Sequence, residues 1–131
     1  MPKAIIKVKQ IHIPIYGVRV TFIYSNSYQA IVKYGEKDGL DEATLKLLGA
    51  KDYEGFHIPL IDKDNIRDYY LVVKKNSDKY EEIDTITHEV SHLVMDMLTT
   101  AGVKLSQKND EPIAYLTGYL NKEFFKFRDG K

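Results

Sequence analysis

The sequence predicts an α+β fold in which an N-terminal sheet packs against two C-terminal helices. Residues 1–76 are rich in strand-like segments, whereas residues 78–127 carry two long segments with helical periodicity. Strands that follow one another through short polar turns usually pair antiparallel, so we expect a twisted sheet that is mostly antiparallel or mixed. No linker is long enough to divide the chain, which predicts a single domain over residues 1–131.

Alternation of side chains and turn-forming residues place the strands in the first third of the chain. Val18 and Val20, for example, alternate with polar residues, and a Ser-Asn-Ser turn follows at residues 25–27. Gly35 ends the last of these segments. The segments predicted here as strands are residues 5–10, 11–16, 18–24 and 28–34.

The middle of the chain predicts a strand at one edge of the sheet. Residues 56–61 have an extended pattern, but Pro59 within them has no N–H to donate to a neighbouring strand. This strand should therefore lie at an edge. A polar turn at residues 62–65 leads to another predicted strand at residues 69–75, where tyrosine and valine are frequent.

Three segments carry helix signals. Residues 41–49 form a short predicted helix, for which Asp41 is the N-cap. Residues 79–101 form a long helix that begins after Asp78 and has an apolar stripe to face the sheet. Residues 111–127 form the last helix, with a proline in its first turn, where proline is tolerated.

Composition and charge exclude several classes of protein. Lys and Arg together number 19, as do Asp and Glu, so the chain has no net charge that would favour nucleic acid or an anionic membrane. The absence of cysteine excludes disulfides and thiolate metal sites. The N-terminus has no signal-peptide core, and no apolar run approaches the roughly 20 residues that span a bilayer. We therefore expect a soluble cytoplasmic protein that binds neither nucleic acid nor membrane.

The segment His88-Glu89-Val90-Ser91-His92 is the most informative part of the sequence. Residues four apart on a helix share one face, so the imidazoles of His88 and His92 can reach one metal ion. Glu89 is rotated about 100° around the axis from His88. Its carboxylate would lie beside the metal, where it can take a proton from metal-bound water. This H-E-x-x-H pattern predicts a zinc hydrolase.

A catalytic zinc site needs a third protein ligand and one open position for water. His12 and His57, the other histidines, lie in strand-like stretches upstream, and the sequence gives neither a role. Glu111, at the start of the last predicted helix, is the better candidate for the third ligand.

The motif at residues 88–92, a glycine at 102 and the segment at residues 111–116 together resemble the zincin-like metallopeptidases that have a glutamate as third ligand. More narrowly, they are similar to small metallopeptidases encoded by phages and prophages, in which the second motif reads Glu-x-x-Ala-Tyr. The resemblance covers residues 78–127. It implies a zincin-like fold, a Zn²⁺ cofactor, a peptide or protein substrate and, for a phage protein, the host cytoplasm.

The resemblance also implies a role for each matching residue. His88, His92 and Glu111 would bind zinc, and Glu89 would act as general base. Apart from the resemblance, helical spacing puts Tyr115 on the face of Glu111, where it could donate a hydrogen bond to a developing oxyanion.

Two aspartates are candidates to orient the zinc ligands. Asp84 lies one turn before His88, and Asp96 lies one turn after His92. Metal-bound histidine usually donates its second N–H to a carboxylate or a carbonyl, and helical spacing makes both contacts possible.

The leading interpretation is a zinc-dependent metallopeptidase that holds an extended peptide along the predicted edge strand at residues 56–61. A second is a catalytically inactive zincin-like module of a phage or mobile element, used for binding or assembly. A third is a metal-free α+β domain in which the motif occurs by chance. Glu89 favours the enzyme, because a purely structural metal site has no need of a general base.

Overall fold

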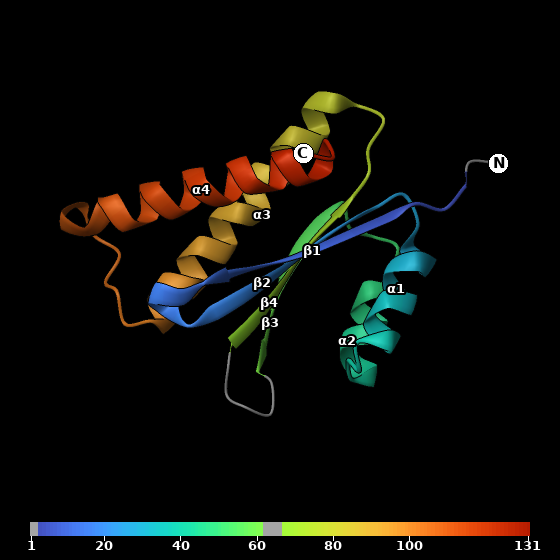
Figure 1. Ribbon diagram of the computed structural model, residues 1–131, viewed down its shortest axis with the longest axis horizontal. Helices are drawn as coiled ribbons and strands as arrows, with labels where there is room; N and C mark the ends of the chain where they lie inside the picture. The colour runs from blue at the N-terminus through green and yellow to red at the C-terminus, as the bar shows by residue number, and fades with distance from the viewer. Residues whose placement is uncertain (1–2, 62–66) are drawn as a thin grey trace.

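A computed structural model describes residues 3–61 and 67–131 of the chain. Pairs of strands and pairs of α-helices follow one another along the chain, and the two longest helices come last (Figure 1). The strands are β1 (Ile6–Ile13), β2 (Val18–Ser25), β3 (Gly55–Ile61) and β4 (Arg67–Lys74). The helices are α1 (Tyr28–Lys37), α2 (Glu42–Leu48), α3 (Lys79–Thr100) and α4 (Asp110–Arg128), with short 3₁₀ turns η1 (Pro14–Tyr16) and η2 (Gln107–Asn109).

The four strands form one mixed sheet in the order β1-β2-β4-β3. β1 pairs with β2 antiparallel, β2 pairs with β4 parallel, and β3 pairs with β4 antiparallel. The predicted α+β class and the mixed sheet are therefore confirmed. β3 lies at an edge, as Pro59 predicted, because the strand order leaves one of its sides unpaired within the described residues.

Helices cover both faces of the sheet. Figure 1 shows α1 and α2 on one side and α3 and α4 on the other. Alternate residues of β4 project to opposite faces of the sheet. Leu71 and Val73 pack toward α3 and α4, whereas Tyr70 and Val72 pack toward α1 and α2. This alternation follows from the two-residue period of a strand.

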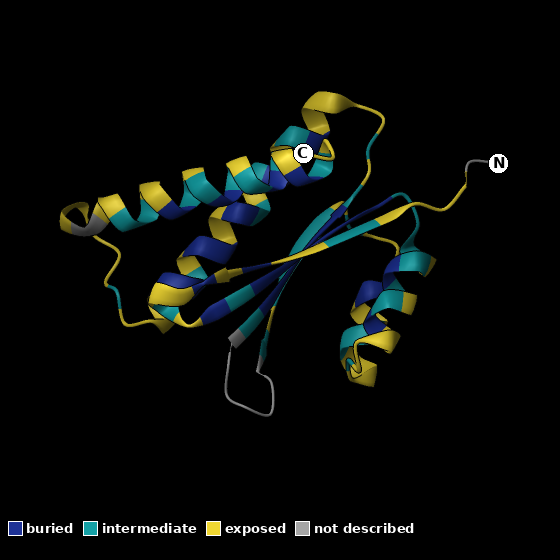
Figure 2. Cartoon of the chain, viewed as in Figure 1, coloured by how far each residue is buried: buried dark blue, intermediate teal, exposed yellow. Residues whose placement is uncertain are grey.

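The larger core lies between the sheet and the two C-terminal helices. Figure 2 shows the buried residues of α3 and α4 on the sides that meet the sheet. Aromatic rings join β2 to α4: the ring centroid of Phe22 is 5.0 Å from that of Phe124 and 5.7 Å from that of Phe127. This packing fixes α4 over the β1–β2 half of the sheet.

The strand predicted at residues 28–34 is wrong, because this segment begins helix α1. Ser27 caps the helix by accepting a hydrogen bond from the backbone N–H of Ala30 at 3.2 Å. Ile31 and Gly35 are buried four residues apart, which is helical spacing. The two segments predicted at residues 5–10 and 11–16 form one strand, β1, followed by η1.

The other predicted helices are confirmed. Asp41 caps α2 by accepting from the N–H of Thr44 at 2.7 Å. Asp78 caps α3 by accepting from the N–H groups of Tyr80 and Glu81 at 2.9 and 3.3 Å. The turn predicted at residues 62–65 lies outside the described residues.

None of the helices in residues 3–61 and 67–131 combines the length and the apolar character needed to cross a bilayer.

Candidate functional site

Helix α3 places His88 and His92 side by side. The centroids of the two imidazole rings are 4.6 Å apart, and the rings meet edge to face at 74°. The side chain of His88 is 62% exposed, so it is accessible to an ion from solvent. The predicted placement of both rings on one helix face is confirmed.

Glu89 faces a different direction, toward strand β3. Its side chain is 13% exposed, and its Cγ lies next to Gly55, where a Cβ atom would come within 3.3 Å of it. The carboxylate Oε2 is 3.9 Å from Nε2 of His88. Glu89 therefore lies beside the histidine pair with most of its side chain withdrawn from water.

His57 on β3 joins this group from across the helix–sheet boundary. Its Nδ1 is 3.5 Å from Oε1 of Glu89. Its ring is nearly parallel to that of His92, at an interplanar angle of 12° and a centroid distance of 5.9 Å. His57, His88, Glu89 and His92 thus form one set of neighbouring side chains, which we call the histidine–glutamate cluster.

The sequence did not identify His57 as a member of the cluster, although β3 carries a signal for it. Phe56, Ile58 and Leu60 pack against the core on the α1–α2 side of the sheet. Alternation then turns His57 to the opposite face, which is the face covered by α3. The alternation alone does not predict that this face of β3 lies beside α3, so it does not place His57 near the motif.

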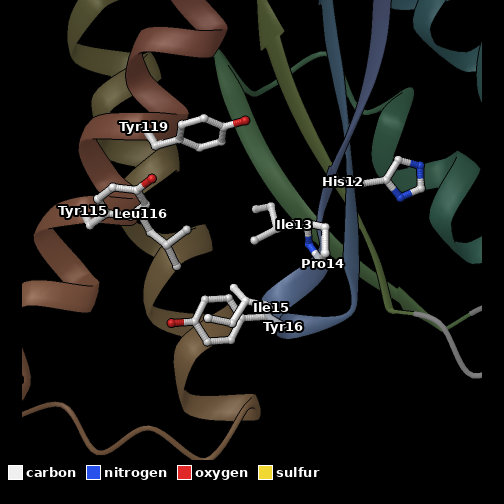
Figure 3. Close-up of a pocket in the computed structure, with 8 residues that line it drawn as sticks. All are labelled: His12, Ile13, Pro14, Ile15, Tyr16, Tyr115, Leu116 and Tyr119. Carbon is white, nitrogen blue, oxygen red and sulfur yellow. The ribbon is translucent and has the colours of Figure 1, made fainter.

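Glu111 lies at the start of α4 and is exposed. Tyr115, one turn further on the same helix face, borders a pocket formed with η1, next to β1 (Figure 3). β1 and β3 are opposite edges of the sheet, so Tyr115, at the pocket beside β1, lies toward one edge and His57 toward the other. The structure brings His88 and His92 together but does not bring Glu111 to them. Its role as third ligand stays a prediction.

The donor atoms of the histidine–glutamate cluster are of the types that zinc prefers. Across residues 3–61 and 67–131, however, no group of three or more His, Asp or Glu side chains is arranged so that it could hold a metal ion. His88 and His92 fit two positions of a zinc site, and a third protein donor is not in place beside them.

Within the described residues, no hydrogen bond or ion pair joins the other predicted site residues to the imidazoles. Asp84 is exposed, and Asp96 accepts a hydrogen bond from the hydroxyl of Thr100 at 3.4 Å. Tyr115 is 72% exposed and stacks on Tyr119, with ring centroids 6.4 Å apart. Figure 3 shows both tyrosines projecting from α4 on the side of the β1–β2 turn. Their predicted roles in orienting ligands and stabilising an oxyanion stay predictions.

Comparison with known proteins adds no relative. No protein family matches the chain, and no curated protein or solved structure is similar to it. The resemblance to zincin-like metallopeptidases therefore depends on the two sequence motifs and on the position of the first motif in α3.

Proposed function

We propose that the chain is a zinc-dependent peptidase whose reaction centre is formed by His88, Glu89 and His92. The observation that carries the proposal is the placement of Glu89. This carboxylate lies against the edge strand β3, mostly withdrawn from water and within 3.9 Å of His88. A metal site with a purely structural role would not need an acidic side chain in that position.

In this mechanism the chain's own residues bind the ion and move a proton. His88 and His92 would hold zinc by their imidazole nitrogens, with Glu111 or another oxygen or nitrogen donor completing the site. Zinc, when bound, polarises a carbonyl and makes a water molecule more acidic. Glu89 accepts the proton of the attacking water and then delivers it to the leaving amine. General acid–base help of this kind contributes about 10²–10⁴-fold in rate.

The substrate class that suits this centre is an extended peptide. β3 pairs with β4 on one side, and its other side is an edge of the sheet next to α3. An extended peptide could add to that edge by backbone hydrogen bonds, with its scissile carbonyl near Glu89. Pro59 removes one backbone donor from the strand and would interrupt the pairing at that position.

A second candidate function is a zincin-like module that binds a partner and catalyses nothing. The observation that favours it is that no group of three ligands is formed among the described residues. Such a module could bind an ion weakly or not at all and still keep the fold.

Two substitutions distinguish the candidates. For Glu89→Gln we expect about one zinc per chain, as in the parent, but no hydrolysis of a mixture of quenched fluorescent peptides, because the proton acceptor is lost. For His88→Ala we expect loss of both zinc and hydrolysis. Zinc is measured by elemental analysis after dialysis. His12→Ala is the matched control, since His12 is exposed on β1 and should change neither property.

The outcomes separate the two candidates clearly. Tightly bound zinc without cleavage of any peptide would favour the binding module. A parent protein without zinc would contradict the zinc peptidase, and cleavage by Glu89→Gln at the parent rate would refute the role of Glu89.

A further inference from the structure

We propose that His57 is a positioning residue for Glu89, whose carboxylate it holds beside the His88–His92 pair. The inference deepens the proposed function and rests on it, because the position of Glu89 matters only if Glu89 moves a proton. Neither the H-E-x-x-H motif nor the second motif contains His57.

The register of the sheet directs His57 toward α3. His57 is paired with Leu71 on β4, and directly paired residues of neighbouring strands project to the same face. Leu71 packs in the core beneath α3 and α4. The imidazole of His57 therefore emerges under α3, at the level of Glu89 and His92.

The contact between His57 and Glu89 is shielded from solvent. Nδ1 and Oε1 are 3.5 Å apart, and the two side chains are 23% and 13% exposed. Polar contacts gain strength where water is partly excluded, because the local dielectric constant is lower. Exposed ion pairs contribute little to the stability of most proteins, but this contact is less exposed than those pairs.

In the described part of the chain, few other contacts constrain the carboxylate of Glu89. Its stem is held against Gly55, but the terminal torsion of a glutamate side chain is soft. His88 approaches the other carboxylate oxygen only to 3.9 Å. Of these two polar contacts among the described residues, the one with His57 is the shorter, so His57 is placed to fix the direction of the carboxylate. Misdirection of a proton acceptor by about 1 Å can cost about 100-fold in rate.

The contact predicts which nitrogen of His57 carries the proton. A neutral imidazole has one N–H and one bare nitrogen, and the hydrogen bond it makes selects between them. Because Nδ1 faces the carboxylate, His57 should carry its proton on Nδ1. This signature requires neither zinc nor hydrolysis, so it tests the contact separately from the proposed function.

The first experiment records imidazole ¹⁵N–¹H correlation spectra of the metal-free protein at about pH 8.5, where an ordinary imidazole is neutral. We expect the Nδ1–H form for His57 in the parent and a shift toward Nε2–H in Glu89→Met, which removes the acceptor. His12, exposed on the opposite edge strand, is the internal control and should not change. An Nε2–H form of His57 in the parent, or the same form in both proteins, would overturn the inference.

The second experiment compares His57→Leu with His57→Gln, which retains an N–H donor, on a fluorescent peptide that the parent cleaves. We expect His57→Leu to lower kcat by about 10–100-fold with KM within about twofold. His57→Gln should recover part of the loss. Zinc affinity, measured by competition with a chromophoric chelator, should stay within about threefold of the parent in both variants.

Each result has a defined meaning. Loss of zinc from His57→Leu would overturn the inference, because it would show that His57 binds the metal. An unchanged kcat would also overturn it, because it would show that His57 serves only in packing. If the parent cleaves no peptide, the proposed function fails, while the ¹⁵N spectra still decide whether His57 engages Glu89.

Discussion

A single buried carboxylate ties three elements together at the start of α3. Glu82 is 5% exposed, and its Oε2 accepts hydrogen bonds from the hydroxyl of Tyr24 at 2.8 Å and from the N–H of Asn76 at 2.9 Å. Its other oxygen pairs with Nη1 of Arg128 at 3.3 Å. Because a buried charge is costly unless it is fully paired, these contacts hold β2, α3 and the end of α4 in one arrangement.

Removal of this carboxylate should destabilise the whole chain. We expect Glu82→Ala to lower the free energy of unfolding by about 3 kcal/mol, since it leaves the Tyr24 hydroxyl and the Asn76 N–H without an acceptor. Glu81→Ala is the matched control at an exposed neighbouring position and should cost less than about 1 kcal/mol. Urea unfolding followed by circular dichroism measures both. Equal losses in the two variants would contradict this account of Glu82.

Spacing along the sequence predicts which residues are neighbours on one helix, but not which residues meet across different elements. Neighbouring positions of His88 and His92 follow from helical spacing alone, and the structure agrees. His57 could not be found in this way, since it is 31 positions before His88 and is brought near by the position of β3 beside α3. The same applies to Glu111: spacing along α4 gives its helix face but not the edge of the sheet toward which α4 packs.

At the scale of elements, the approach of α3 to β3 determines where Glu89 lies. Gly55 permits this approach, because a Cβ there would lie 2.7 Å from Cγ2 of Thr85 and 3.0 Å from the carbonyl oxygen of Val72. The first of these atoms belongs to the helix, and the second belongs to the backbone of β4. The Val72 oxygen cannot withdraw without moving β4, and the Thr85 side chain is held by the hydrogen bond that its hydroxyl donates to the carbonyl oxygen of Glu81 at 3.0 Å.

Addition of one methyl group at this boundary should therefore be costly. We expect Gly55→Ala to lower the free energy of unfolding by roughly 1–3 kcal/mol and to shift the imidazole NMR signals of His57 and His92. Gly118→Ala is the control: Gly118 is exposed on α4 and no other element of the described chain comes within 4 Å of the added Cβ, so it should stabilise by about 0.5–1 kcal/mol. If Gly55→Ala were as stable as the parent, the close approach would not be a constraint.

Helix α1 shows why one element was predicted wrongly. Residues 28–34 contain two adjacent β-branched residues and two tyrosines, a composition that favours a strand. The helix forms because Ser27 caps it and because Ile31 and Gly35 fit against the sheet and α2 at helical spacing. Local propensity was outweighed by a cap and by tertiary packing, neither of which is evident in a seven-residue window.

On the scale of the whole molecule, buried tyrosines lie on both sides of the sheet. Tyr24 packs in the core beneath α3 and α4, whereas Tyr70 packs in the core beneath α1 and α2. Burial raises the pKa of the Tyr24 phenol above its usual range, and the hydrogen bond to Glu82 raises it further. Burial and the hydrogen bond to Asp38 raise the pKa of Tyr70 in the same direction. Both layers of the fold therefore depend on neutral phenols.

This dependence predicts a loss of stability in alkali. In the unfolded chain these phenols ionise near pH 10, whereas in the native state they stay protonated, so the unfolded state binds fewer protons above that pH. The free energy of unfolding should be steady below about pH 9 and should then fall, with each buried tyrosine contributing about 1.4 kcal/mol per pH unit. Tyr70→Phe should reduce the slope of the free energy of unfolding against pH by the contribution of one tyrosine, and Tyr24→Phe should reduce it by the same amount. Urea unfolding between about pH 8 and 11 measures the slopes, and parallel curves for the parent and both variants would show that these phenols ionise equally in the two states.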